Sequence, residues 1–231
     1  MFRAGKFVLT RQRLRRLDGL DMGVLRRGRD DSALAELQID RFAEVQVELH
    51  VLCPSSSGRW QVRHPKIDFR DSDLNLETLV FNWYSDIVVA VGSYLCWVDY
   101  CIGGILLCDA FDASSRLQYI PFPDKLPNLD RALHGRSVSE LYQGVSVIED
   151  HGFFKFAMVV QGDGQRFTPA SGFKLTSWTM KITDEANMSW TIDSVLDSDD
   201  LWKLDDFARP EHHVLCVEGR KREGGDWLQD D

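Results

Sequence analysis

Residues 94–123 read YLCWVDYCIGGILLCDAFDASSRLQYIPFP, and this stretch decides the fold class. An aromatic and acidic run ending at Asp99 is followed by the pair Gly103-Gly104, an apolar run closed by Asp109, and a third run ending in Pro-Phe-Pro. The runs are too short for stable helices, and turn-forming residues separate them. The stretch therefore predicts three antiparallel strands joined as a β-meander.

The chain on both sides of the meander has the same character. Residues 43–51 alternate strictly between apolar and polar side chains, the pattern of a half-buried strand. The runs 87–91, 144–148, 153–160, 173–182 and 189–192 are short and mostly apolar, as strands are, whereas the polar residues 63–77 predict a loop. Only residues 197–207, with Asp197 or Ser198 as N-cap, predict a short helix. The sequence thus predicts an all-β fold.

A weak internal repeat favours one all-β architecture over others. The hairpins Val47–Trp60 and Trp178–Trp190 both consist of an alternating strand, a polar turn and a tryptophan that opens the return strand. Short strands at even spacing with a recurring aromatic residue are typical of β-propeller blades. About ten to twelve strands are expected, fewer than four blades of four strands need, so whether the predicted propeller-like array is complete or incomplete stays open. A β-sandwich is the alternative with similar spacing.

Composition changes mark three regions along the chain. Residues 1–31 carry nine Lys or Arg against four Asp and predict a disordered basic leader. Within it, residues 11–16 read RQRLRR, which is also the pattern of a nuclear-import tag or of a patch that binds an anionic surface. Residues 32–219 predict the all-β domain, and residues 220–231 a charged, frayed tail.

Charge and cysteine content exclude several classes of protein. A net charge of −9 leaves no overall electrostatic attraction for nucleic acid, and no apolar run is long enough to span a bilayer. The five cysteines are odd in number and include no CxxC pair, which favours a reduced, intracellular location in the cytoplasm or nucleus. No nucleophile or phosphate-binding motif is present, and no cofactor is expected.

Three clusters of chemically active residues suggest sites and also have simpler structural interpretations. His212, His213 and Cys216 lie close together but lack a second pair of ligands, so we predict strand residues rather than a metal site. An acidic group lacks the glycine and closing glutamate of a calcium loop, and comprises Asp197, Asp199, Asp200, Asp205 and Asp206. Asp99 and Asp109 suggest a carboxylate pair for acid–base work, but acids at strand ends more often fix turns. No metal ligand or catalytic residue is therefore predicted.

Residues 97–160 resemble the core of the plant family called domain of unknown function 1618. In that family a Trp-x-Asp strand leads to Gly-Ile-Leu-x-Cys-Asp and then to a strand ending in Pro-x-Pro. The positions that match are Trp97, Asp99, Gly104, Ile105, Leu106, Cys108, Asp109, Pro121 and Pro123. The resemblance implies a β-propeller fragment in the style of the kelch-like domains that follow F-boxes in plant ubiquitin-ligase receptors. The resemblance also implies that these matching residues have structural roles rather than catalytic ones.

Three functions remain open at this level. The first is a non-enzymatic module that presents loops, such as residues 63–77 and 124–138, to a protein partner. The second is a hydrolase or lyase that uses carboxylates such as Asp99 and Asp109. The third is a fragment of the ubiquitin-ligase receptor type without an F-box, since residues 1–31 do not supply a leucine-rich helical segment.

Overall fold

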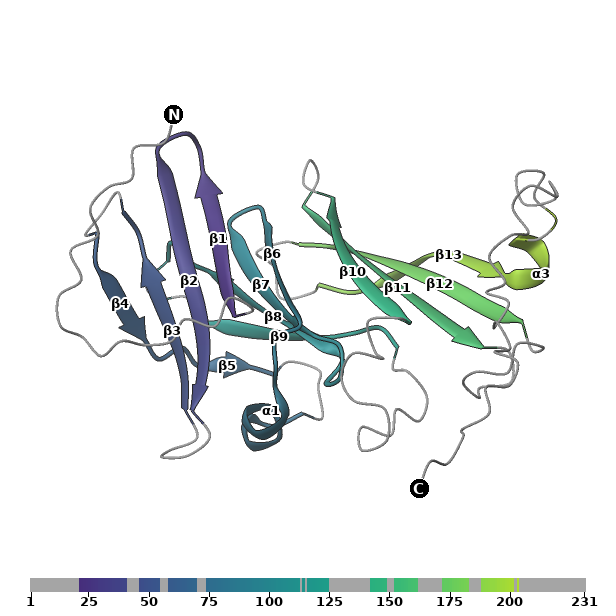
Figure 1. Ribbon diagram of the computed structural model, residues 1–231, viewed down its shortest axis with the longest axis horizontal. Helices are drawn as coiled ribbons and strands as arrows, with labels where there is room; N and C mark the ends of the chain where they lie inside the picture. The colour runs from purple at the N-terminus through teal and green to yellow at the C-terminus, as the bar shows by residue number, and fades with distance from the viewer. Residues whose placement is uncertain are drawn as a thin grey trace, which may run out of the picture.

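The computed structural model describes residues 21–40, 46–54, 58–69, 74–112, 114, 116–124, 142–148, 152–161, 172–182, 188–201 and 203. Within these residues the chain forms thirteen strands and two helices. The strands make three sheets that follow one another along the chain (Figure 1). All neighbouring strands pair antiparallel except β5 and β9. The prediction of a mostly β fold is confirmed.

Sheet 1 is a four-stranded meander at the N-terminal side. Its strands are β1 (Met22–Arg27), β2 (Asp31–Asp40), β3 (Gln46–Leu52) and β4 (Trp60–Arg63), in that order. The alternation predicted for the third strand is present, because Val47, Leu49 and Val51 are buried on one face. That face lies against sheet 2.

Sheet 2 contains the predicted meander. Its strands are β5 (Ile67–Asp68), β6 (Ile87–Val91), β7 (Tyr94–Asp99), β8 (Gly104–Asp109) and β9 (Leu117–Pro121). The strands β6 to β9 pair in sequence, and β5 adds to the outer edge by pairing parallel with β9. The helix α1 (Leu76–Asn82) lies between β5 and β6 in the chain. The meander over residues 94–123 is thus confirmed.

Sheet 3 is a second four-stranded meander at the C-terminal side. Its strands are β10 (Gln143–Ile148), β11 (Phe153–Gln161), β12 (Phe173–Lys181) and β13 (Thr191–Asp197), followed by the short helix α3 (Ser198–Leu201). A register shift beside Ser177 and Trp178 marks a bulge between β12 and β13. The two hairpins that share a sequence form, β3–β4 and β12–β13, are the last two strands of sheets 1 and 3.

Two apolar cores separate the sheets, and sheet 2 lies between them. Because successive side chains in a strand point to opposite faces, Leu95 and Trp97 of β7 face sheet 1, while Cys96 and Val98 face sheet 3. Phe154, Phe156 and Met158 of β11 fill the second core. The middle sheet is therefore covered on both faces.

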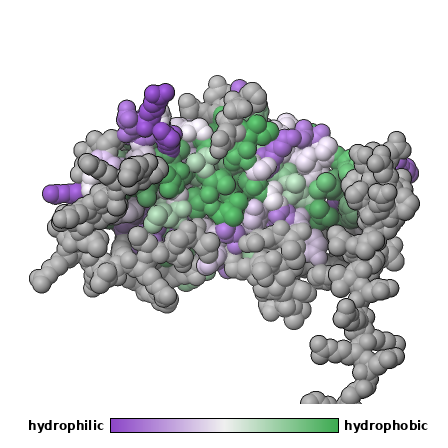
Figure 2. Space-filling model, turned by 45° about the horizontal axis from the view of Figure 1, so that its top comes forward, coloured by the Kyte–Doolittle hydropathy of each residue, from purple (hydrophilic) through white to green (hydrophobic). Residues whose placement is uncertain are grey.

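The sheets approach one another along their first strands. β1 contacts β6 and β7, and β10 contacts β6, whereas the fourth strands are separated in Figure 1. An apolar band crosses the middle of the face seen in Figure 2, over the region where these first strands meet. The sheets thus converge at their first strands and spread apart toward their fourth strands.

Several sequence predictions need correction. Residues 22–27 form β1 and residue 31 begins β2, so the predicted leader over residues 1–31 is wrong at its end; residues 1–20 lie outside the described residues. Residues 63–77 are not a plain loop, because they contain β5 and the start of α1. Of the helix predicted over residues 197–207, the described residues show Ser198–Leu201 as α3. The helix α1 was not predicted. Residues 124–138 beyond Asp124, the basic run 11–16 and the tail 220–231 also lie outside the described residues.

Candidate functional site

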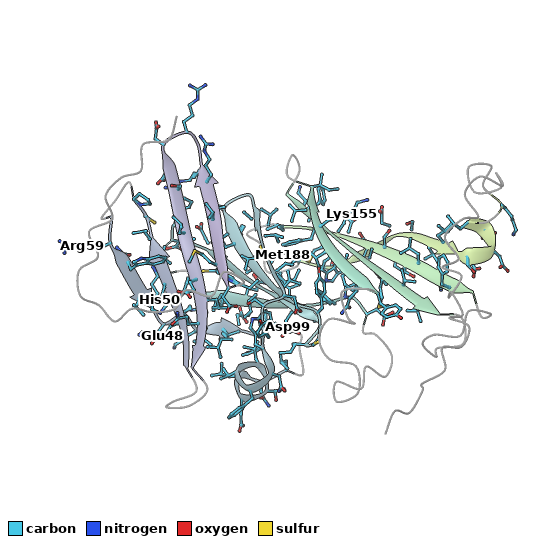
Figure 3. The ribbon with its side chains drawn as sticks, in the orientation of Figure 1. Glu48, His50, Arg59, Asp99, Lys155 and Met188 are labelled. Carbon is cyan, nitrogen blue, oxygen red and sulfur yellow. The ribbon has the colours of Figure 1, made fainter. Side chains whose placement is uncertain are left out.

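The Asp99 side chain is the best-connected group of the signature. It is fully buried at the end of β7, and Figure 3 shows it at the lower end of the middle sheet. Its Oδ1 accepts backbone N–H bonds from Cys101 at 2.7 Å and from Ile102 at 2.8 Å. Its Oδ2 accepts a bond from the backbone N–H of Tyr84 at 2.8 Å. The carboxylate therefore fixes the β7–β8 turn and ties it to the segment that follows α1.

The turn that Asp99 organises also holds β9 and β10. The Gly103 carbonyl accepts bonds from the Phe122 N–H at 2.9 Å and from the Tyr119 hydroxyl at 3.3 Å. The Tyr100 carbonyl accepts a bond from Gln143 Nε2 at 2.6 Å. Gly103 takes φ of 80°, a left-handed conformation that glycine adopts without strain. Residues 99–104 thus form a joint, named here the Asp99 turn, between sheets 2 and 3 and the segment after α1.

Gly104 is required by the ring of Tyr119. A Cβ atom at residue 104 would lie 2.5 Å from Tyr119 Cε2 and from its hydroxyl oxygen. The ring is buried, and burial together with the negative charge of Asp99 raises the pKa of this phenol. Any side chain at residue 104 therefore displaces a ring that is enclosed by the core.

We expect Gly104→Ala to lower the free energy of unfolding by about 1–3 kcal/mol, the cost of overpacking a filled core. Chemical denaturation measures this. The matched control is Gly144→Ala, because a Cβ atom at residue 144 meets no atom within 4 Å. Adding Tyr119→Leu to Gly104→Ala should recover part of the loss by making room. Equal losses at residues 104 and 144 would show that the ring does not impose the requirement.

Asp109 lies at the opposite end of the hairpin from Asp99. The strand register pairs Asp99 with Gly104 and Tyr94 with Asp109. At about 3.3 Å per residue, the two acids are separated by about 17 Å along β8. Asp109 Oδ1 accepts N–H bonds from Phe111 and Asp112 in its own turn. The hypothesis that Asp99 and Asp109 act as a carboxylate pair is therefore wrong.

The remaining signature residues lie in the cores and at strand ends. Trp97 is fully buried, and its Nε1 donates a bond to the Asp21 carbonyl at 2.8 Å, which joins β7 to the start of sheet 1. Cys108 is buried beside it on the same face. The Pro121 carbonyl accepts a bond from Trp190 Nε1 at 2.9 Å, and Pro123 is half-buried just beyond β9.

The thiols and acidic clusters show no arrangement for metal binding in the part of the chain that the structure describes. There, no three His, Cys, Asp or Glu side chains lie close enough to share a metal ion. Burial, reinforced by Cys108, raises the pKa of the Cys96 thiol well above its usual value. Asp205, Asp206, His212, His213 and Cys216 lie outside the described residues.

An open pocket of about 570 Å³ lies between β3 and the segment that leads into α1. Its volume falls within the range of about 300–1,000 Å³ typical of ligand sites. The lining is mainly apolar, with two basic side chains, and consists of Val47, His64, Pro65, Lys66, Ile67, Phe69 and Leu76. All of these except Val47 belong to the segment 63–77. The sequence suggested this segment as a loop for a partner but gave no sign of a pocket.

The helix α1 borders this pocket and exposes further apolar side chains. Asn75 caps its first turn by accepting a bond from the Thr78 N–H at 2.8 Å. Leu79, Val80 and Trp83 are buried on its inner side. Leu76 is 41% exposed at the pocket, and Phe81 and Tyr84 are exposed farther along. The helix thus has one face in the core and a second apolar surface toward solvent.

The sheets, the Asp99 turn and the pocket define a mostly β protein of three consecutive sheets, in which the Asp99 turn joins sheets 2 and 3. The chain belongs to the DUF1618 family of proteins of unknown function, whose family model matches residues 97–218. The match includes the whole of β8 to α3 and extends beyond the core 97–160 that the resemblance covered. No curated protein and no solved structure matches the chain. In the described part of the chain, neither helix is long and apolar enough to cross a membrane.

Proposed function

We propose that this protein is a non-enzymatic protein-interaction module and that its pocket between Val47 and Leu76 receives an apolar side chain of a partner. The pocket carries this proposal. It is open, it is lined largely by aliphatic and aromatic groups, and exposed apolar residues of α1 lie beside it. Pockets that anchor one buried side chain, surrounded by further contacts, are the usual form of a binding hot spot.

The basic side chains at the pocket indicate the chemistry of the partner. His64 and Lys66 are both exposed at the pocket lining. A carboxylate next to the anchoring side chain would meet the Lys66 ammonium, which favours a segment with an apolar and an acidic residue. The structure offers no paired carboxylates at Asp99 and Asp109, so these residues do not support the hydrolase or lyase alternative.

The proposed architecture is a propeller-type array in which each sheet is one blade. Its support is the convergence of the first strands, β1, β6 and β10, because propeller blades surround a common axis with their first strands innermost. The kelch-like style of the plant family fits the same proposal. An intracellular location is also part of the proposal, and its support is the odd number of cysteines, five, without a CxxC pair.

A displayed random-peptide library panned against the intact protein tests the binding site. We expect selected peptides to combine an apolar and an acidic residue and to lose at least tenfold in affinity for Lys66→Glu and for Leu76→Asp. Both side chains are exposed, and an aspartate in the first turn of α1 is favourable for the helix, so folding should be kept. Binding is measured by fluorescence polarisation with a synthetic peptide.

The control is Val195→Asp, which makes the same kind of change at an exposed position of sheet 3. It should leave the peptide affinity unchanged. If no peptide is selected, or if all three variants bind equally well, the pocket is not the binding site.

A further inference from the structure

The strand β5 is an edge strand of sheet 2 and lies at the pocket. In the described part of the chain it pairs with β9 on one side, and no strand pairs with its other side, called here the open edge of β5. Ile67 of β5 lines the pocket together with Val47 of β3 and Leu76 of α1. Figure 1 shows β5 between β3 and α1. The open edge and the apolar pocket are therefore parts of one surface.

The backbone hydrogen bonds of this segment show which residue faces the open edge. The Lys66 carbonyl accepts a bond from the Leu117 N–H at 3.1 Å, so the backbone polar groups of Lys66 point toward β9. In a strand, the N–H and C=O of one residue point to the same edge, and those of the next residue point to the opposite edge. The N–H and C=O of Ile67 consequently point away from β9. Among the described residues, neither of these two groups has a hydrogen-bond partner.

The side chain of Ile67 shows where a strand added at the open edge would place its own side chains. Ile67 pairs with Leu117 and packs against the first core, so it faces sheet 1. A residue opposite Ile67 in an added strand would share that face, because directly opposite residues lie on the same side of a sheet. Its side chain would then enter the pocket beside Val47. The residues before and after it would point to the other face of the sheet.

The charges on that other face favour an acidic residue on one side only. Lys66 and Asp68 both lie there, because they flank Ile67 in the chain. Lys66 is exposed, whereas Asp68 is half-buried and already interacts with another group. An acid opposite Lys66 gains an attraction, and an acid opposite Asp68 meets a like charge. The acidic residue of a bound segment is therefore expected directly beside its apolar residue, on the Lys66 side.

The open edge is protected against strands that have no side chain for the pocket. β5 has two residues, and Pro65 has no N–H group to donate. Very short edge strands and edge prolines are devices that prevent unwanted strand pairing. The N–H and C=O of Ile67 alone are too few to hold a strand. In strand addition, main-chain hydrogen bonds contribute affinity and side-chain pockets contribute specificity, so binding at this edge needs both.

We propose that the partner segment binds in an extended conformation, as an additional strand on the open edge of β5. One apolar side chain of the segment occupies the pocket, its backbone exchanges hydrogen bonds with the N–H and C=O of Ile67, and a neighbouring acidic residue meets Lys66. This mode of binding rests on the proposed function, because it states how the segment received by the pocket is held. It excludes a helical segment, whose N–H and C=O groups are bonded within the helix.

A scan of N-methylated peptides tests the added strand. The peptide is one that the library selects, and each of its backbone N–H groups is replaced by N–CH₃ in turn. We expect the affinity to fall by about tenfold or more at the residue that donates to the Ile67 carbonyl. It should change by less than about threefold at the residues on either side, because their N–H groups point away from β5. The Ile67 amide proton should also exchange with solvent about tenfold more slowly in the complex.

Ile67→Pro tests the same hydrogen bonds from the side of the protein. Proline is accepted in an edge strand where the missing N–H would face solvent, so sheet 2 should still fold. The matched control is Ile67→Ala, which removes more of the side chain but keeps the N–H. Ile67→Pro should weaken peptide binding by about tenfold more than Ile67→Ala does. Circular dichroism shows whether both variants are folded.

The possible outcomes separate this mode of binding from the proposed function. A peptide that depends on Lys66 and Leu76 but tolerates N-methylation at every residue would overturn the added strand and leave the proposed function standing. A peptide that becomes helical on binding, seen by circular dichroism, would overturn the added strand as well. If the library yields no peptide, both the proposed function and the added strand are wrong.

Discussion

Asp99→Ala lowers the free energy of unfolding by about 4 kcal/mol, which is one of the two largest single losses expected in this chain. The substitution removes a buried carboxylate and leaves the N–H groups of Tyr84, Cys101 and Ile102 without their acceptor. Each bond to a charged acceptor contributes about 1.5–3 kcal/mol, and part of this is recovered if water enters the space. Urea denaturation followed by tryptophan fluorescence measures the loss.

Two further variants separate the buried carboxylate from turn-fixing acids in general. Asp99→Asn keeps one oxygen, so it should retain the bonds to Cys101 and Ile102 and lose about half as much free energy. Asp112→Ala removes an exposed aspartate that accepts bonds from the Ser114 N–H and hydroxyl, both at 2.8 Å. Its effect should be much smaller than that of Asp99→Ala. Comparable effects at residues 99 and 112 would contradict the assignment of Asp99 as the joint between segments.

Phe156→Ala lowers the free energy of unfolding by about 3–5 kcal/mol and releases sheet 3 from sheet 2. Phe156 is fully buried, and its ring lies 4.4 Å from the Phe122 ring and 5.5 Å from that of Trp178, measured between centroids. It joins the Phe122 ring, one residue beyond β9, to the Trp178 ring of β12 across the second core. Hydrogen exchange should therefore show lost protection in β10 to β13 before β6 to β9.

The matched control for this variant is Phe81→Ala. The same atoms are removed there from a side chain that is 52% exposed on α1. Its effect on unfolding should stay within about 0.5 kcal/mol. If Phe156→Ala instead lowered the protection from hydrogen exchange evenly over all three sheets, sheet 3 would not be released separately from sheet 2.

The elements that the sequence predicted correctly are those with a strong local pattern. The meander over residues 94–123 has turn residues at both bends, and the alternation of Val47, Leu49 and Val51 survives because one face is buried against sheet 2. Apart from β5, which pairs with β9, the strand order in each sheet follows the chain order, since each strand of a meander pairs with the next. Burial on both faces of β7 was not predictable, because it depends on sheets 1 and 3 packing from opposite sides.

The elements β1 and α1 were not predicted because neither has a clear strand or helix pattern in its sequence. β1 reads MGVLRR, and its arginines suggested a solvated leader. In the structure Arg27 lies over the Phe111 ring at 4.1 Å and bonds Asp31, so its charge is compatible with a strand. α1 has only seven residues, too few for a clear helical period, although Asn75 is a recognisable N-cap.

The pocket could not be predicted because its walls come from distant parts of the sequence. Val47 lies in sheet 1, while Ile67 belongs to a two-residue strand that exists only by pairing with β9. A strand of this length has no sequence signature of its own. The signature residues could be placed on strands from sequence, but the joint that Asp99 forms with Tyr84 depends on where α1 ends.

The parallel pairing of β5 with β9 sets an order of assembly for the chain. Ile67 pairs with Leu117, and the Leu117 N–H bonds the Lys66 carbonyl at 3.1 Å. The partner of β5 is the last strand of the meander, so β5 can join the sheet only once β9 is in place. Contacts between residues so far apart in sequence form late, because closing the long loop costs chain entropy first. The same pairing brings Ile67 and Lys66 to the pocket, which therefore becomes complete only in the finished fold.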